Sequence, residues 1–243
     1  MTPPLFLVDH LPVGDEMLLS GEEGRHAARV KRMRPGEELL VSDGGGGVLR
    51  CEVTKVVADA LQVAILSREH VPPADPRLVV VQALPKGERA ELAVESMTEL
   101  GVDEIVPWAA ARSVAQWRGA RGEKALLRWR RTAREAAKQS RRARIPDVTS
   151  LVGTVGAAAR LRAATCALVL DEDAPTPLAR VALPDTGEIA VVVGPEGGVS
   201  REEIGAFEDA GAVPVRLGSP VLRTSTAGAA ALAALSLRVG RWD

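Results

Sequence analysis

The chain has very few aromatic residues: its 243 residues include no tyrosine and two phenylalanines. This scarcity argues against an RNA-binding platform of the RRM kind, which stacks bases on exposed rings. The two cysteines, Cys51 and Cys166, lie in separate apolar contexts and form no C-x-x-C pair, and the three histidines are scattered. We therefore expect two buried free thiols and no metal site built from cysteine and histidine.

Long apolar runs are also missing. No stretch reaches the roughly 20 apolar residues that a membrane-spanning helix needs. The N-terminal residues lack the charged-then-apolar pattern of a signal peptide. These absences predict a cytoplasmic protein that makes no membrane contact.

The net charge is only −1, but it is unevenly distributed. Residues 112–144 contain twelve Lys or Arg and two Glu, so the remainder carries −11, and a second basic cluster at 25–34 contains no acid. Local clustering sets the field that a polyanion meets, and Arg forks bind phosphate bidentately, so both clusters favour RNA binding over a merely solvated face. The predicted RNA-binding residues are Arg25, Arg29, Lys31, Arg32, Arg34, Lys86, Arg112, Arg128, Arg131, Arg134, Arg141 and Arg142.

A proline-rich segment, Val71 to Pro76, separates two kinds of sequence. Before it, short alternating runs at Glu38–Ser42 and Val48–Val57 flank the glycines 44–47, which is typical of a hairpin. The segment itself suits a semi-rigid linker. We therefore predict a small β-barrel domain over residues 1–72.

After the linker, apolar runs alternate with helical segments, which predicts an α/β domain with a parallel sheet over residues 77–243. The apolar runs are Leu78–Leu84, Thr165–Leu170, Ile189–Val193 and Pro214–Leu217.

The third of these runs ends in a glycine-rich turn, GPEGG, that begins at Gly194. Gly197 and Gly198 permit a positive φ and let another group approach the main chain. Ser200 and Glu203 form a capping box that opens a helix over 201–210. Ligands of open α/β sheets bind at the carboxyl ends of strands, so this turn is a candidate binding loop.

A second unit of the same kind follows at once. Pro214–Leu217 is predicted as a strand, Gly218–Leu222 as a loop and Thr224–Val239 as a helix. Two loops from neighbouring strands can line one pocket. GPEGG matches neither G-x-G-x-x-G nor the P-loop pattern, which speaks against a dinucleotide or a nucleoside triphosphate and for a different cofactor.

The sequence GPEGGVSREE followed by LGSPVLRTSTA resembles the C-terminal signature of the RsmE family. LPKGERAELAVESMTELGVDEIVPWAAARSV and EAAKQSRRARIPDV resemble two further blocks of that family, and HAARVKRMRPGE matches it more weakly. The resemblance implies a PUA-like barrel followed by a SPOUT domain whose trefoil knot holds S-adenosylmethionine. It also implies a homodimer that methylates N3 of a uridine in 16S ribosomal RNA of the small subunit.

The same resemblance implies a pocket that contacts the cofactor mostly through main chain, with apolar walls from the second loop and a carboxylate facing the ribose or the sulfonium. The implied cofactor-binding residues are Leu170, Glu172, Gly194, Pro195, Glu196, Gly197, Gly198, Leu217, Gly218, Val221, Leu222, Thr224, Thr226 and Ala227.

Methylation at N3 requires loss of the N3 proton, so the protein must supply a base or a cation against the uracil oxygens. Arg223 is the candidate cation, although a structural ion pair that holds the knot is an alternative role for it. Family members commonly carry Glu where this chain has Ser225, which can still accept a hydrogen bond but is a poor base. If that Glu is essential to proton removal in relatives, water or Glu196 would take the proton here. The candidate catalytic residues are Arg223, Ser225 and Glu196. Ser96 in place of Lys and Arg141 in place of Gly are further departures.

Two other functions remain open. The sequence TSTA is more similar than T-E-T-A to the loop of SPOUT enzymes that methylate a ribose 2′-oxygen in rRNA or tRNA. A non-catalytic RNA-binding assembly factor would keep both basic clusters and need no cofactor pocket.

Overall fold

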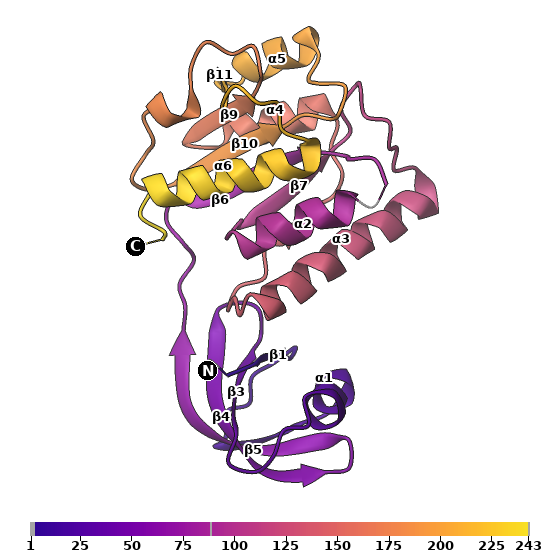
Figure 1. Ribbon diagram of the computed structural model, residues 1–243, viewed down its shortest axis with the longest axis vertical. Helices are drawn as coiled ribbons and strands as arrows, with labels where there is room; N and C mark the ends of the chain where they lie inside the picture. The colour runs from indigo at the N-terminus through magenta and orange to yellow at the C-terminus, as the bar shows by residue number, and fades with distance from the viewer. Residues whose placement is uncertain (1–2, 88, 243) are drawn as a thin grey trace. The chain divides into compact units, whose positions relative to one another are not determined.

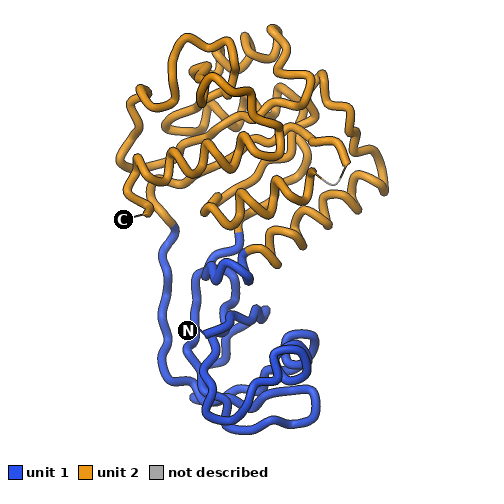
Figure 2. The backbone as a smooth tube through the Cα atoms, in the orientation of Figure 1, with its two compact units in different colours: residues 1–73, 137–145 blue, residues 74–136, 146–243 orange. Residues whose placement is uncertain are grey.

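The computed structural model describes residues 3–87 and 89–242. The chain divides into two compact units, which we call unit 1, residues 1–73 with 137–145, and unit 2, residues 74–136 with 146–243 (Figure 2). The expected division is residues 1–72 and 77–243. In the structure the units meet between residues 73 and 74, and residues 137–145 group with the N-terminal part of the chain.

Unit 1 contains a five-stranded mixed sheet in the order β1-β3-β4-β5-β2. The pairing of β1 with β3 is parallel and the other pairings are antiparallel. The predicted hairpin runs correspond to β3 and β4. The elements are β1 (Leu5–Leu7), β2 (Glu16–Leu19), α1 (Gly21–Arg25), the π-helical turn η1 (His26–Val30), β3 (Glu38–Ser42), β4 (Gly47–Val57) and β5 (Ala60–His70).

The core of unit 1 is apolar and includes Cys51 on β4. Burial raises the pKa of the Cys51 thiol to about 11, so the thiol stays protonated and unreactive at neutral pH. Both cysteines are free, as predicted, but Cys166 in unit 2 is only half-buried. Burial raises the pKa of Cys166 as well.

The glycine-rich loop between β3 and β4 receives the segment 137–145. The N–H of Gly46 donates to Ala143 O at 3.1 Å, and the N–H of Ile145 donates to Gly44 O at 3.0 Å. A Cβ on Gly44 would lie 2.4 Å from Ile145 Cδ1, so a side chain there would collide with the returning segment. The glycines that the sequence indicates as a hairpin turn therefore also make room for a segment that is distant in sequence.

We expect Gly46→Ala to destabilise unit 1 by roughly 2–4 kcal/mol. Gly46 has φ +106°, and a Cβ would lie 2.5 Å from the carbonyl oxygen of Val71. Gly36→Ala is the matched control, since Gly36 has φ +87° with no atom within 4 Å of the added Cβ. Calorimetric unfolding should show a loss of about 1 kcal/mol for the control. Equal losses for the two variants would contradict the collision.

Unit 2 contains a six-stranded, wholly parallel sheet in the order β11-β9-β10-β6-β7-β8. Each of the four predicted runs overlaps a strand: β6 (Arg77–Ala83), β9 (Cys166–Leu170), β10 (Glu188–Val193) and β11 (Val213–Val215). Sequence reasoning missed β7 (Glu104–Trp108) and β8 (Asp147–Val148). Pro107 inside β7 cannot donate a ladder hydrogen bond and weakens the strand signal.

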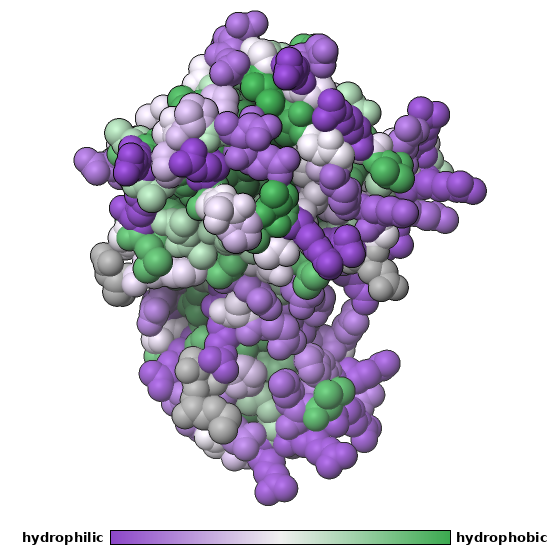
Figure 3. Space-filling model, turned by 45° about the horizontal axis from the view of Figure 1, so that its top comes forward, coloured by the Kyte–Doolittle hydropathy of each residue, from purple (hydrophilic) through white to green (hydrophobic). Residues whose placement is uncertain are grey.

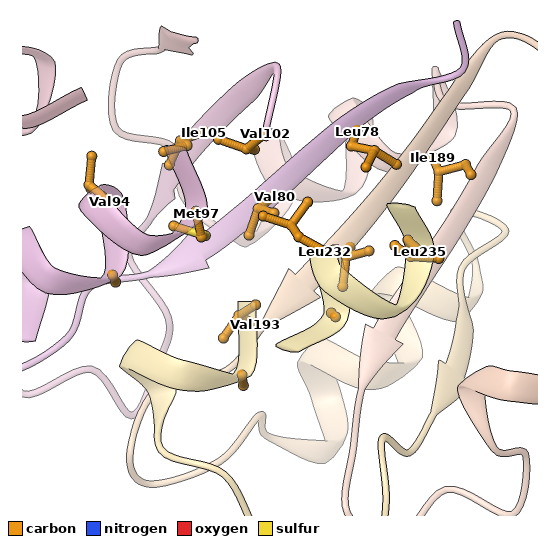
Figure 4. Close-up of a cluster of buried hydrophobic side chains, with 14 of the residues drawn as sticks. Leu78, Val80, Val94, Met97, Val102, Ile105, Ile189, Val193, Leu232 and Leu235 are labelled. Atoms are coloured by element: carbon orange, nitrogen blue, oxygen red, sulfur yellow. The ribbon is translucent and has the colours of Figure 1, made fainter. Parts of the chain in front are cut away.

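Helices cover both faces of this sheet (Figure 1). On one face, side chains of α2 (Arg89–Glu99), α6 (Thr224–Arg238) and the part of α3 (Gly119–Gln139) that belongs to unit 2 join one apolar core. Figure 4 shows Met97 of α2 and Leu232 of α6 close to Val80 of β6 in this core. On the other face, α4 (Thr154–Arg162) and α5 (Arg201–Glu208) form a second core around Trp108 and Phe207.

Loops follow the carboxyl ends of β9, β10 and β11, with the starts of α5 and α6 beside them. Within the described residues, none of the helices is both long and apolar enough to cross a membrane.

Candidate functional site

A pocket of about 810 Å³ lies where β9, β10 and β11 end and α6 begins. Both predicted binding loops contribute to it, and so does the acidic turn after β9. Fourteen of the predicted cofactor-binding and catalytic residues line it: Leu170, Glu172, Gly194, Pro195, Glu196, Gly197, Gly198, Leu217, Gly218, Val221, Leu222, Arg223, Thr224 and Ala227.

The structure does not bring Ser225 and Thr226 to this pocket. Arg223 is the N-cap residue of α6, so Ser225 already lies in the first helical turn, where its side chain is buried. Thr226 is exposed, and neither residue is among those that line the pocket. The resemblance placed both residues by motif position, which does not tell which way a side chain points from a helix.

Other residues line the pocket without having been predicted for the cofactor. Most are sequence neighbours of the predicted residues, so their loops were the only signal for them. Arg112 is different, because it lies 82 residues before Gly194 and was predicted for RNA. The additional lining residues are Arg112, Asp171, Asp173, Val193, Val199, Arg201, Ile204, Arg216 and Pro220.

The GPEGG loop is held by its own turn and by the predicted capping box. The N–H of Gly198 donates to Pro195 O at 2.9 Å, and Gly198 has φ +73°, which favours glycine. The Ser200 hydroxyl accepts the N–H of Glu203 at 3.2 Å, while Glu203 Oε2 accepts the N–H of Ser200 at 3.0 Å. This reciprocal pair fixes where α5 starts.

Two contacts from other loops hold the outer side of GPEGG. Arg112 Nη1 donates to Gly197 O at 3.0 Å, and the backbone N–H of Lys86 donates to Glu196 Oε1 at 3.1 Å. A Cβ on Gly197 would lie 3.1 Å from Arg112 Cβ, which is tight packing. Gly197 therefore lets the Arg112 side chain lie against the loop.

The acidic turn after β9 is fixed from β11. Arg216 Nη1 donates to the carbonyls of Ala174 and Pro175 at 2.7 and 2.8 Å. The N–H of Asp171 donates to Val215 O at 2.9 Å. Arg216 thus orients the turn that carries three pocket carboxylates.

Charges of both signs face the pocket. A bound cation such as a sulfonium is favoured near the acidic side chains, and an anion near the basic ones. Glu202 is next to the pocket residue Arg201 in sequence, and hydrogen bonds from its own backbone N–H and from Ser200 lower the pKa of Glu202, helped by Arg112 and Arg201. The acidic lining residues are Asp171, Glu172, Asp173 and Glu196, and the basic ones are Arg112, Arg201, Arg216 and Arg223.

Among the residues that the structure describes, no group of three or more His, Cys, Asp or Glu side chains is placed to hold a metal ion.

Comparisons with known proteins agree with this geometry. Residues 73–236 match the family model described as an RNA methyltransferase domain, and residues 19–66 match the RNA methyltransferase PUA domain. A ribosomal RNA small subunit methyltransferase E of Mycobacterium bovis is 49% identical over 248 residues, covering 100% of this chain and 95% of the relative. The chain belongs to the RsmE family.

Two solved structures resemble this RsmE-family chain over 98% of both chains in each comparison. The Neisseria gonorrhoeae ribosomal RNA small subunit methyltransferase E bound to S-adenosyl methionine has a TM-score of 0.87 at 29% identity. A putative methyltransferase of Legionella pneumophila, in complex with the cofactor SAM, has a TM-score of 0.85 at 28% identity. The α/β fold with an N-terminal PUA-like sheet is thereby confirmed, whereas the knot stays a prediction of the RsmE resemblance.

The basic residues of unit 1 that are predicted to bind RNA differ in how much of their charge is offset by nearby acidic side chains. Asp59 lies 2.5 Å from Arg29 and 4.0 Å from Arg25, so it offsets part of their charge. Lys138, on the segment 137–145, is buried and pairs with Glu23 at 2.6 Å, which removes it from the surface. The exposed predicted residues of this unit are Arg25, Arg29, Lys31, Arg32, Arg34 and Arg141, and Arg142 is half-buried.

In unit 2 the basic surface follows α3. Arg128 and Arg131 are exposed one turn apart, and Arg134 is half-buried. Arg128 lies 3.7 Å from Glu91, at a surface position where such a pair is weak. Figure 3 shows hydrophilic side chains projecting from its right edge, the side on which the start of α3 lies in Figure 1. Lys86 is exposed, at the edge of the GPEGG loop.

Proposed function

We propose that this RsmE-family chain methylates N3 of a specific uridine in the 16S RNA of the small ribosomal subunit, with S-adenosylmethionine as methyl donor. The observation that carries the proposal is the loop-built pocket, which contains Arg223 and the glycines of both family signature loops. The relatives are named as ribosomal RNA small subunit methyltransferases, and one of them is bound to S-adenosyl methionine. We also propose that the protein acts in the cytoplasm, where this substrate is found.

The pocket suits S-adenosylmethionine chemically. The glycines put main chain without side chains on the pocket wall, where it can meet an adenine edge, and Leu217, Val221 and Leu222 offer apolar surface to its ring. Val221 is 73% exposed and Leu222 38% exposed, so both have apolar area to bury on a ligand. The carboxylates of the turn after β9 lie where they can offset the sulfonium charge or bind the ribose. The cofactor itself supplies the electrophilic methyl group.

The protein's contribution at uracil is to favour loss of the N3 proton. Arg223 is exposed at the start of α6, so its guanidinium can face the negative charge that grows on the uracil oxygens. Glu196 is exposed in the same pocket, with one carboxylate oxygen held by the Lys86 amide. We assign Arg223 to charge stabilisation and Glu196 to acceptance of the proton. Ser225, buried off the pocket, takes no part in this assignment.

Because Ser225 is buried off the pocket, it lends no support to the ribose 2′-O-methylation alternative. That hypothesis depends on Ser225 replacing the usual Glu at the reacting centre. A non-catalytic assembly factor would need no cofactor pocket, so the pocket does not support that alternative.

Mass spectrometry of nuclease-digested 16S RNA tests the proposal. RNA from a deletion strain should lack one N3-methyluridine, and a plasmid-borne copy of the gene should restore it. A persisting mark would show that another enzyme makes it, and a missing ribose methyl group would instead favour the 2′-O alternative. Calorimetry on the purified chain should detect S-adenosylmethionine binding, and its absence would favour the assembly factor.

We further propose that unit 1 binds RNA and that two chains form a homodimer through α2 and α6. These helices pack together in unit 2, and exposed apolar side chains remain on both, Leu92 at 51% and Leu237 at 64%. Small residues on α6 permit close helix packing. Light scattering should give the dimer mass for the native chain, and Leu237→Arg should shift it toward the monomer.

A further inference from the structure

Glu203 is a buried acid to which the proposed mechanism gives no role. It lies in the first turn of α5, is only 4% exposed and is not among the residues that line the pocket. Burying a carboxylate is unfavourable unless donors satisfy it. Three donors reach it, and the capping box accounts for only one of them.

The other two donors come from distant parts of unit 2. Glu203 Oε1 accepts the backbone N–H of Ala111 at 2.7 Å and the hydroxyl of Thr154 at 3.2 Å. Ala111 belongs to the loop after β7, and Thr154 begins α4. Thr154 Oγ1 also accepts Trp108 Nε1 at 3.4 Å, so the hydroxyl is oriented toward the carboxylate. One side chain therefore joins three segments that are separate in sequence.

The Ala111 contact determines where the next residue lies. Arg112 follows directly, lines the pocket and donates to Gly197 O at 3.0 Å. The loop after β7 is thus attached twice to the segment 194–203, once at Gly197 and once at Glu203. Without the Glu203 attachment, the hydrogen bond between these two loops that remains is the one from the exposed Arg112 side chain to Gly197 O.

We propose that Glu203 is a positioning residue for the cofactor pocket: by accepting the Ala111 amide, it fixes the loop that presses Arg112 against GPEGG. This inference rests on the proposed function, because the ligand whose affinity it sets is S-adenosylmethionine. Glu203 acts through the Ala111 amide and Arg112 and does not touch the ligand.

The test compares variants that differ in which bond they remove, using calorimetric S-adenosylmethionine affinity on the purified full chain. Glu203→Leu removes every acceptor and should raise Kd at least about tenfold. Glu203→Gln keeps one acceptor oxygen. The Ala111 N–H and the Thr154 hydroxyl both donate on the same side, so they favour the orientation in which that oxygen faces them, and Kd should stay within about threefold of the native value. At saturating cofactor, kcat of Glu203→Leu should change less than about threefold, because Arg223 is unaltered.

Ser200→Ala is the structural control. It removes the cap of α5 and lowers the melting temperature, yet leaves the Ala111 contact, so Kd should stay within about twofold. Ala111→Pro deletes the same hydrogen bond from the donor side and should repeat the Glu203→Leu increase in Kd. Because proline also restricts the backbone at Ala110, the decisive outcome for this variant is a native Kd.

The possible results distinguish a failure of the positioning role from a failure of the proposed function. A native Kd in Ala111→Pro, or an equal Kd in Glu203→Leu and Ser200→Ala, overturns the positioning role. If the native chain binds no S-adenosylmethionine, the proposed function fails instead. Should Glu203→Leu not fold, Ala111→Pro decides.

Discussion

Arg223→Ala is expected to slow methyl transfer by about 10²–10³ while S-adenosylmethionine still binds. The guanidinium is exposed in the pocket, at the start of α6, and acts on charge that appears only as N3 reacts. Losing a donor aimed at developing charge lowers kcat by about 10²–10³. Cofactor affinity should change less than about fivefold, because the two loops offer mostly main-chain groups and apolar side chains that the substitution leaves in place.

Single-turnover methylation of 16S RNA, combined with calorimetry, measures the two effects separately. Arg223→Lys should recover part of the rate, because it keeps the positive charge but loses the planar fork. Arg201→Ala is the matched control, since Arg201 is another exposed arginine that lines the pocket, on α5 instead of α6. The methylation rate of Arg201→Ala should fall less than about tenfold. Unchanged methylation in Arg223→Ala would remove this residue from the mechanism and leave it a structural role.

The parts of the pocket that sequence predicted are those whose causes are local. An apolar β-branched run, a glycine turn and a capping box all lie within fifteen consecutive residues, 189–203, and each imposes its own backbone geometry. The same holds for the second loop and the start of α6. Nearly all of the predicted cofactor-binding residues accordingly line one pocket.

The parts that sequence missed depend on contacts between distant segments. Nothing near Arg112 indicates that its guanidinium reaches Gly197, 85 residues away, and nothing near Glu203 indicates the Ala111 amide. The capping box explains Glu203 so well that no second role is suggested. Likewise, the glycines 44–47 fit an ordinary hairpin, while the structure uses them to admit residues 143–145.

Ser225 differs from the residues predicted to bind the cofactor. The resemblance implies an active-site acid at this position, but the chain carries a small hydroxyl there that the structure buries in the first turn of α6. A buried serine in this place is compatible with helix packing, and the carboxylates that line the pocket come from Glu196 and the turn after β9. Motif position therefore predicted a loop that lines the pocket, whereas the direction of the side chain from the helix keeps Ser225 out of that lining.

Reversing Arg128 and Arg131 to glutamate is expected to lower the affinity for 16S RNA about 10- to 100-fold near physiological salt. Both side chains are exposed on α3, one helical turn apart, where they can face neighbouring phosphates. Folding should be little affected, because the surface pair of Arg128 with Glu91 at 3.7 Å contributes at most about 1 kcal/mol. Cofactor affinity should not change, since neither residue lines the pocket.

A salt titration separates direct phosphate contacts from net charge. Replacing both residues with glutamine should reduce the slope of log K against log salt by about 1.4–1.8, the value for two lost phosphate contacts. Arg162 and Arg180, both exposed in unit 2 outside α3, provide a control pair whose reversal changes the net charge equally. If the control pair weakens binding as much, only overall charge matters. If neither pair does, α3 is a solvated face and the RNA must bind elsewhere.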